Sequence, residues 1–249
     1  MHLLRFVEFV SDSLLSVAYP QPCSLCGSNV ESHDLGVCCQ QCWQLTTIFD
    51  GAETVCWKCG VVTSGSISPV RVDAARCHRC DDQSFTAARA CGLYEYALRS
   101  SALQLKREAY LPKRLLSLLI ATARRAPIDA ATRVMPVPLH SERLKSRGFN
   151  QAAVIAEAVA RSLNLPLDDT SLIRSGVSDK YRAGLDAKAR EDTVTGAFSV
   201  RYPALVNAED ILLVDDVFTT GATASSCGQA LFDAGARSVF VLTIARPRH

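Results

Sequence analysis

The sequence predicts an α/β fold, with a mostly parallel sheet flanked by helices, preceded by a small cysteine-rich module. Two observations support this prediction. From residue 91 onward, short apolar segments alternate with segments of helical periodicity, which is typical of a parallel sheet covered on both faces. Ten of the 11 cysteines fall before residue 92, and most of them lie in polar, turn-rich sequence. We therefore divide the chain into an N-terminal helix at 1–20, a cysteine-rich module at 21–84 and an α/β domain at 90–249.

The first segment predicts a short amphipathic helix, because residues 3–17 place apolar side chains at near-helical spacing. We prefer a helix that packs on its own domain over one that binds a membrane or a partner, because Glu8 and Asp12 do not suit a basic membrane-binding face. No secretory signal is recognisable, and no apolar run approaches the roughly 18 residues that span a bilayer. We therefore expect a cytoplasmic protein without membrane insertion.

Eight cysteines form four Cys-x-x-Cys pairs. The pairs are Cys23 with Cys26, Cys39 with Cys42, Cys56 with Cys59, and Cys77 with Cys80. Each pair can present two thiolates to one ion, and zinc prefers four such ligands in a tetrahedron. In a reducing compartment, clustered cysteines favour metal binding over disulfides. The sequence therefore predicts two structural Zn²⁺ sites without an open coordination position. We expect the pairs to combine in sequential order, although the sequence leaves crossed pairing open.

Other side chains near these pairs have more than one interpretation. Cys38 lies beside Cys39 and could replace it as a ligand, whereas His33 and His78 fit surface or turn positions better than ligand positions. Cys91 and Cys227 are most simply buried thiols. A stacking and phosphate-contacting face for nucleic acid could be formed by Trp43, Trp57, Lys58 and Arg79. For the tryptophans, packing against the thin core of the module is the preferred interpretation.

The α/β domain is expected to alternate strands and helices in a regular order. Strands are predicted at 91–98, 132–138, 172–174, 196–200, 210–214 and 238–244. Helices are predicted at 99–126, with a break near Leu111 and Pro112, at 150–163 and at about 221–234. The polar segment 175–194 is expected to be a mobile loop. The excess of basic over acidic residues lies in this second part of the chain, which is weak evidence for a nucleic-acid partner.

The most informative motif spans residues 211–223. An apolar strand runs into Asp215 and Asp216, whose carboxylates suit the vicinal hydroxyls of a ribose at the carboxyl end of a strand. A threonine-rich turn then opens a helix, where backbone N–H groups and the helix dipole favour a phosphate. The residues of this turn are Thr219, Thr220, Gly221, Ala222 and Thr223. The pattern predicts a sugar-phosphate site, and a simple N-cap at a strand–helix junction does not explain its length.

A second motif lies at 137–151, where a strand end leads into a basic loop. Arg143, Lys145 and Arg147 place positive charge near the predicted carboxyl edge of the sheet. This loop suits a pyrophosphate, although a solvated basic turn explains the charges equally well. Asn150 is expected to cap the helix that follows.

Together these motifs resemble a known family. The segment 211–223 is similar to the phosphoribosyl-pyrophosphate signature of type I phosphoribosyltransferases. The Val-Pro-Leu and Arg-Gly-Phe-Asn-Gln sequences at 137–151, the cysteine pairs and the Leu105-Lys106 pair resemble the ComF family of competence-associated proteins over nearly the whole chain. The resemblance implies a type I phosphoribosyltransferase fold behind a double zinc ribbon.

The same resemblance assigns residues. Asp215 and Asp216 would hold the ribose hydroxyls, with bound Mg²⁺. The 5′-phosphate would lie on Thr219, Thr220, Gly221, Ala222 and Thr223, where Ala222 stands in place of a glycine that many members have. The pyrophosphate would lie near Arg147, Gly148 and Asn150, and Lys106 would face the same site.

One region departs from the family pattern. Members often carry a Gln and an Arg-Asn pair in the flexible loop, where this chain has Arg182 and the pair Asp192 and Thr193. Closure of this loop excludes water from a reactive sugar cation, so the changes weaken the case for retained catalysis.

Three functions fit the sequence. The first is a phosphoribosyltransferase that moves the phosphoribosyl group to a base-like acceptor, with Asp215, Asp216 and Lys106 as catalytic residues. The second is a non-catalytic protein of DNA uptake that binds single-stranded DNA through the zinc ribbon and the basic α/β domain. The third is a regulator that senses phosphoribosyl pyrophosphate without turnover.

Overall fold

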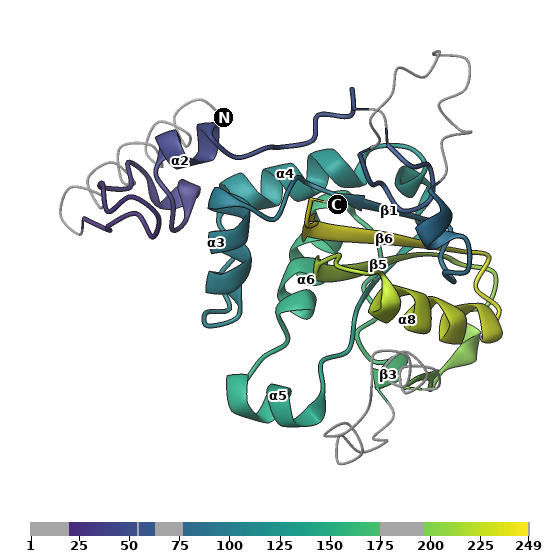
Figure 1. The fold of residues 1–249 in the computed structure, drawn as a ribbon. Helices are drawn as coiled ribbons and strands as arrows, with labels where there is room; N and C mark the ends of the chain where they lie inside the picture. The colour runs from purple at the N-terminus through teal and green to yellow at the C-terminus, as the bar shows by residue number, and fades with distance from the viewer. Residues whose placement is uncertain (1–19, 54, 63–76, 175–196, 249) are drawn as a thin grey trace, which may run out of the picture.

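The computed structural model describes residues 20–53, 55–62, 77–174 and 197–248 (Figure 1). The predicted helix at 3–17 and the polar loop at 175–194, with Arg182, Asp192 and Thr193, lie outside the described residues. No helix within these ranges combines the length and the apolar character needed to cross a membrane.

A four-stranded parallel sheet forms the centre of the molecule. Its strands lie in the order β1 (Ala87–Ala90), β6 (Ser238–Ala245), β5 (Asp210–Val217) and β2 (Arg133–Pro136). The two central strands, β5 and β6, are apolar along most of their length because both faces of the sheet are covered. The predicted architecture, a parallel sheet flanked by helices, is therefore confirmed.

Helices cover one face of this sheet and a mixed layer covers the other. The first face carries α3 (Tyr96–Leu105), α4 (Lys113–Ala123) and α6 (Gln151–Leu163). The second face carries α8 (Ala222–Asp233) and a small antiparallel sheet of β3 (Leu172–Arg174) and β4 (Phe198–Val200) (Figure 1). Short 3₁₀ turns complete the described chain at His33–Leu35, His78–Cys80, Ile128–Ala130 and Pro203–Leu205.

Two predictions about local structure were wrong. The strand expected at 91–98 lies at Ala87–Ala90 instead, because these residues pair with β6. The chain then turns, and α3 begins at Tyr96, whose φ is 39°. The basic segment expected to be a loop contains the helix α5 (Ser141–Arg147), which His140 caps at its start and Gly148 ends in a left-handed conformation. The predicted break in the helical region 99–126 is confirmed by the gap between α3 and α4.

The cysteine-rich part of the chain is built into the domain on both faces of the sheet. Cys23, Cys39 and Cys42 share a core with α3 and α4, and the short helix α2 (Gln40–Gln44) belongs to this first side. Cys56, Cys59 and Cys80 share the other core with α8. Trp43 is 3% exposed, and its indole N–H donates to the Leu35 carbonyl at 3.0 Å. The preferred interpretation of this tryptophan as a packing residue is confirmed.

Candidate functional site

Strand β5 delivers two carboxylates to the carboxyl edge of the sheet. Val214 is the last residue of β5 that pairs with β2, and Asp215 is paired with Thr243 of β6. The backbone N–H of Asp216 donates to Asp215 Oδ1 at 2.8 Å, and that of Val217 donates to Asp216 Oδ1 at 2.9 Å. These two short contacts fix both carboxylates beside the strand end, where open α/β sheets bind ligands.

Lys106 lies at the same site, although it is more than 100 residues away in the sequence. It follows α3 as its C-cap residue, and its Nζ lies 3.1 Å from Asp216 Oδ2. The lysine side chain is 32% exposed and the aspartate side chain 12% exposed, so the pair is only partly screened by water. The structure therefore places Lys106 against Asp216, while its role toward a ligand stays a prediction.

Burial and the neighbouring charge change the acidity of this pair. Burial, followed by the negative charge of Asp216, raises the pKa of Asp215 to about 8, and the Lys106 ammonium offsets part of this effect. Near neutral pH, Asp215 therefore keeps its proton. A neutral carboxyl can both donate and accept a hydrogen bond, which suits a ligand with vicinal hydroxyls.

The threonine-rich turn between β5 and α8 forms the next part of the site. Thr219, Thr220 and Thr223 are exposed, and Gly221 precedes α8 with a φ of +84°. The first N–H groups of a helix have no partner within the helix, so the start of α8 offers donors to an anion. A small hollow of about 20 Å³ lies against the turn and is lined in part by Asp215. We call residues 219–223 the phosphate loop.

A residue that the sequence did not single out braces this loop. The Gln83 side-chain amide donates to the Thr220 carbonyl at 2.6 Å. A Cβ atom on Gly221 would lie 2.5 Å from Gln83 Oε1 and 2.8 Å from Phe218 Cζ, so glycine is required for close packing as well as for its positive φ. Nothing in the sequence around Gln83 marks this role, since the contact spans 137 residues.

The next residue extends the same brace onto α8. The Ser84 backbone N–H donates to Ser225 Oγ, and its hydroxyl donates to Gln229 Oε1, both at 2.8 Å. A Cβ atom on Gly228 would lie 1.7 Å from the Ser84 carbonyl oxygen. The segment that leaves the second cysteine cluster is therefore seated on the phosphate loop and on the helix behind it.

The basic segment occupies another part of the molecule's edge. Arg143 and Lys145 are exposed on α5, which projects from the body of the domain (Figure 1). Arg147 is half-buried, and its buried Nη1 has no hydrogen-bond partner among the described residues. Within the same ranges, no ion pair joins these three residues to Asp215 or Asp216. The structure thus brings Lys106 to the aspartates and leaves the α5 cations apart from them.

Asn150 and Gly148 shape the turn after α5. Asn150 Oδ1 accepts from the Ala152 N–H at 3.0 Å, which confirms the predicted N-cap of α6, and its amide donates to the Val137 carbonyl at 3.0 Å. The Gly148 N–H donates to the Leu144 carbonyl at 2.8 Å and closes α5. Both residues hold the backbone in place, while their contact with a pyrophosphate stays a prediction.

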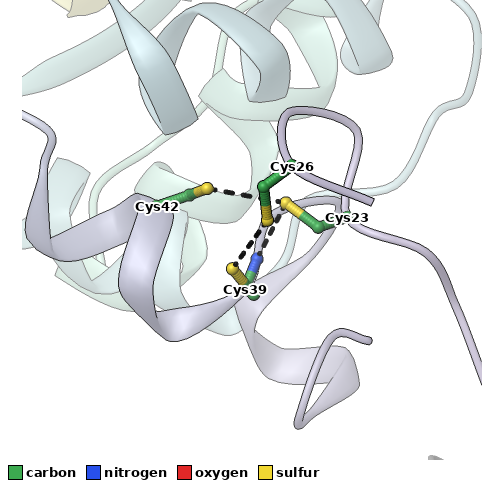
Figure 2. Close-up of side chains that lie close together, drawn as sticks. All are labelled: Cys23, Cys26, Cys39 and Cys42. Atoms are coloured by element: carbon green, nitrogen blue, oxygen red, sulfur yellow. Dashed lines mark hydrogen bonds between the residues drawn. The ribbon is translucent and has the colours of Figure 1, made fainter. Parts of the chain in front are cut away.

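The eight paired cysteines form two clusters. Cys23, Cys26, Cys39 and Cys42 converge in the first cluster, as Figure 2 shows. The second cluster consists of Cys56, Cys59, Cys77 and Cys80. Sequential pairing is therefore confirmed, and Cys38, His33 and His78 belong to neither cluster.

The spacing of the sulfur atoms fits zinc. Sγ–Sγ distances are 3.7 Å for Cys23 and Cys42 and 3.6 Å for Cys26 and Cys39, with 3.4–3.7 Å in the second cluster. An ideal tetrahedron with Zn–S bonds of about 2.3 Å has S–S separations of about 3.8 Å. Four thiolates at this spacing can hold zinc and leave no coordination position open.

Backbone donors prepare some of these thiols for metal binding. Burial opposes ionisation of Cys23, but the N–H groups of Cys26, Cys39 and Leu25 together lower its pKa to about 6. The pKa of Cys56 falls to about 7 in the same way. Burial instead raises the pKa of Cys59 to about 11, and it also raises the pKa of Cys38, whose Sγ contacts Ser24 Oγ at 3.5 Å. The pKa shifts thus differ among the thiols of one cluster.

No family model matches the sequence. The DNA utilization protein YhgH of Escherichia coli O157:H7 is 30% identical over 202 residues, which cover 78% of this chain and 85% of that protein. Competence protein F of Haemophilus influenzae is 33% identical over 140 residues, which cover 53% of this chain and 58% of that protein.

Solved structures give a weaker likeness. A glutamine phosphoribosylpyrophosphate amidotransferase from Bacillus subtilis, complexed with ADP and GMP, aligns with a TM-score of 0.37 and 20% identity, over 59% of this chain and 26% of that one.

The match to YhgH and to competence protein F, together with the two four-cysteine clusters and the parallel α/β domain, shows that this chain belongs to the ComF family.

Proposed function

We propose that this protein binds phosphoribosyl pyrophosphate at the carboxyl edge of its sheet. The observation that carries the proposal is the convergence of three features at one strand end. These are the carboxylates of Asp215 and Asp216, the ammonium of Lys106 and the phosphate loop. A ligand with vicinal hydroxyls, a phosphate and a further anionic group has matching partners here.

Each group has a chemical role in this proposal. Asp215 and Asp216 hydrogen-bond the ribose hydroxyls, and the phosphate loop accommodates the 5′-phosphate at the start of α8. Lys106, whose Nζ lies 3.1 Å from Asp216 Oδ2, and Arg147 supply positive charge for the pyrophosphate. The carboxylates are also the oxygen ligands that Mg²⁺ prefers, and the ion would neutralise charge on the pyrophosphate.

A transfer reaction is the enzymatic form of this proposal. The bond between C1 of the ribose and the pyrophosphate oxygen breaks, pyrophosphate leaves with the electron pair, and an acceptor nitrogen bonds to C1. Asp215 and Asp216 stabilise positive charge on the sugar as the bond lengthens, and Lys106 stabilises the leaving group. A sensor would bind the same ligand without releasing pyrophosphate.

Calorimetric titration of the zinc-loaded chain with phosphoribosyl pyrophosphate and Mg²⁺ tests the site. We expect saturable binding that disappears in the Asp215→Asn/Asp216→Asn double variant. Asp233→Asn, at the exposed end of α8, is the matched control and should bind like the wild type. Absence of wild-type binding at millimolar ligand would refute both the enzyme and the sensor. Pyrophosphate release on addition of nucleobases then separates these two.

DNA binding is a second candidate, supported by a separate observation. Relatives are named for DNA utilization and competence, and α5 projects with Arg143 and Lys145 exposed. We expect a fluorescent single-stranded oligonucleotide to bind with an affinity that falls steeply as salt rises. Arg143→Glu/Lys145→Glu should weaken binding, whereas Arg99→Glu on α3 should not. Equal binding by both variants would argue against α5 as the DNA surface.

A further inference from the structure

A short segment joins the second cysteine cluster to the phosphate loop. Gln83 follows closely after Cys80, a member of this cluster, and the Gln83 backbone N–H donates to the Cys80 carbonyl at 3.2 Å. The side-chain amide of Gln83 donates to the Thr220 carbonyl at 2.6 Å. A single residue therefore hydrogen-bonds a cysteine of the cluster through its backbone and the phosphate loop through its side chain.

The other cysteine pair of the same cluster also holds this segment. Lys58 lies between Cys56 and Cys59, and its Nζ donates to the carbonyl of Asp81, which follows Cys80, at 3.1 Å. Four thiolates on one ion would fix the two cysteine pairs relative to each other. Metal binding would therefore hold the segment at both of these points.

A second connection between the cluster and the loop runs through Arg246, which is 3% exposed. Its Nη1 donates to the Cys59 carbonyl, and its guanidinium lies over the Phe218 ring, 5.4 Å from the centroid. Phe218 is the residue before the phosphate loop, and its ring also meets the Phe85 ring edge to face at 5.8 Å. The cluster is thus connected to the start of the loop as well as to Thr220.

The hydrogen bond from Gln83 fixes the orientation of one peptide group in the phosphate loop. The peptide between Thr220 and Gly221 is trans, so its carbonyl and its N–H point in opposite directions. Glycine adopts positive and negative φ about equally well, so Gly221 by itself does not prevent this peptide from rotating. Holding the Thr220 carbonyl on Gln83 directs the Gly221 N–H to the other side, at the start of α8.

The first cysteine cluster provides an internal comparison. It shares a core with α3 and α4, whereas the second cluster shares a core with α8 on the other face of the sheet. Metal binding at the two clusters should therefore differ in its effect on the phosphate loop.

We propose that Gln83 is a positioning residue through which metal binding at the second cluster sets the conformation of the phosphate loop. The inference rests on the proposed function for the identity of the ligand, a sugar 5′-phosphate. Coupling between two binding sites is reciprocal, so a phosphate on the loop should raise the zinc affinity of the second cluster. We expect a rise of about tenfold, within the usual range of such couplings.

Hydrogen exchange of the ligand-free full chain tests the conformational part of the inference. We expect the amides of residues 219–223 to exchange at least about fivefold faster in Cys77→Ser, which lacks a ligand of the second cluster, than in Cys26→Ser. Gln83→Leu keeps all eight cysteines and removes the donor, and it should accelerate exchange over the wild type. Gln44→Leu, at an exposed position of α2, should not.

Equal exchange of the loop in the two cysteine variants would overturn the inference. If Cys77→Ser fails to hold its remaining zinc ion, the zinc-loaded Gln83→Leu variant decides instead. Exchange in that variant at the wild-type rate would overturn the inference as well.

Equilibrium competition with a chromophoric chelator tests the reciprocal effect on zinc. In Cys26→Ser, where the second cluster is the intact one, ribose 5-phosphate should raise the zinc affinity about tenfold. The added substitution Gln83→Leu should abolish this gain, whereas Gln44→Leu should preserve it. A purely structural role of Gln83 would lower the zinc affinity equally with and without the sugar phosphate. A gain that persists without the Gln83 amide would overturn the inference.

The experiments separate the two proposals. If calorimetry shows no binding of ribose 5-phosphate to the wild type, the proposed function fails, and the exchange of the ligand-free loop still decides the inference. If ribose 5-phosphate binds and Gln83→Leu changes neither the exchange nor the gain in zinc affinity, the inference fails alone.

Discussion

At the scale of single residues, the adjacent carboxylates give the site its electrostatic character. Asp216 has Lys106 as its counter-ion at 3.1 Å, whereas Asp215 has burial and a like charge beside it. The Asp215 carboxyl therefore ionises less readily than that of an ordinary aspartate, which makes the stability of the folded protein depend on pH.

The pH dependence has a definite sign. The pKa of Asp215 is about 8 in the folded protein, against an ordinary value of 3.8, so the folded protein keeps a proton that the unfolded chain has lost. The stabilisation is complete below about pH 4 and is lost as pH rises to about 8. We expect Asp215→Asn to gain stability relative to the wild type between about pH 5 and 8 in urea unfolding. Asp233→Asn should show no such trend, and a constant Asp215→Asn difference would contradict the assignment.

Two glycines with similar φ angles allow the cost of backbone strain to be distinguished from the cost of close packing. Gly148 has φ +80° and no atom within 4 Å of the position that a Cβ would take, whereas Gly221 has φ +84° and Gln83 at 2.5 Å from that position. Gly148→Ala should cost about 1–2 kcal/mol from the left-handed conformation alone. Gly221→Ala should cost more, because it also breaks the hydrogen bond from Gln83 to Thr220. Denaturation curves measure both losses, and equal losses would show that the Gln83 contact is unimportant.

A double substitution provides the control for that interpretation. Gln83→Ala removes the side chain that opposes a Cβ atom at position 221, so the two substitutions together should cost less than the sum of their separate effects. Strict additivity would mean that the Phe218 ring, and not Gln83, excludes the methyl group.

At the scale of elements, each cysteine cluster acts as a unit of four ligands. Since the clusters are separate in space, losing one ligand should affect one metal site. We expect two zinc ions per chain in the wild type and about one in Cys26→Ser or Cys59→Ser, measured by mass spectrometry of the metal content. Cys38→Ser should retain two, because Cys38 belongs to neither cluster. A loss of zinc in Cys38→Ser would show that this thiol does exchange with Cys39.

At the scale of the whole molecule, the cysteine clusters and the α/β domain share their cores. The first cluster packs with α3 and α4 on one face of the sheet, and the second packs with α8 on the other. A separate module would melt by itself, but shared cores predict cooperative unfolding. We expect the loss of helix, followed by circular dichroism, to coincide with zinc release in one thermal transition. A chelator should lower that transition temperature, and restored zinc should reverse the effect. Two transitions, with zinc released in the first, would indicate independent units.

The sequence by itself determined the features that are local in the chain. The strand that carries Asp215 and Asp216 near its end, the helix that Asn150 caps and the sequential cysteine pairs all depend on residues close to one another, so their spacing is visible without a structure. The signature at 211–223 and the Cys-x-x-Cys pairs also identified the family. The sequence predicted a strand wrongly where pairing with another strand decides its position. At 91–98 no strand forms, because residues 87–90 are the ones that pair with β6.

Only the tertiary structure decided which distant residues complete the site. Lys106 was expected near the aspartates from family resemblance, but its ion pair with Asp216 depends on how α3 packs against the sheet. The hydrogen bond from Gln83 to Thr220 and the position of Arg246 over the Phe218 ring were not expected from the sequence. The physical reason is common to these cases. Periodicity and spacing indicate the conformation of a single segment. Which segments meet at one edge or face of the sheet depends on packing between residues that lie more than 100 positions apart in the sequence.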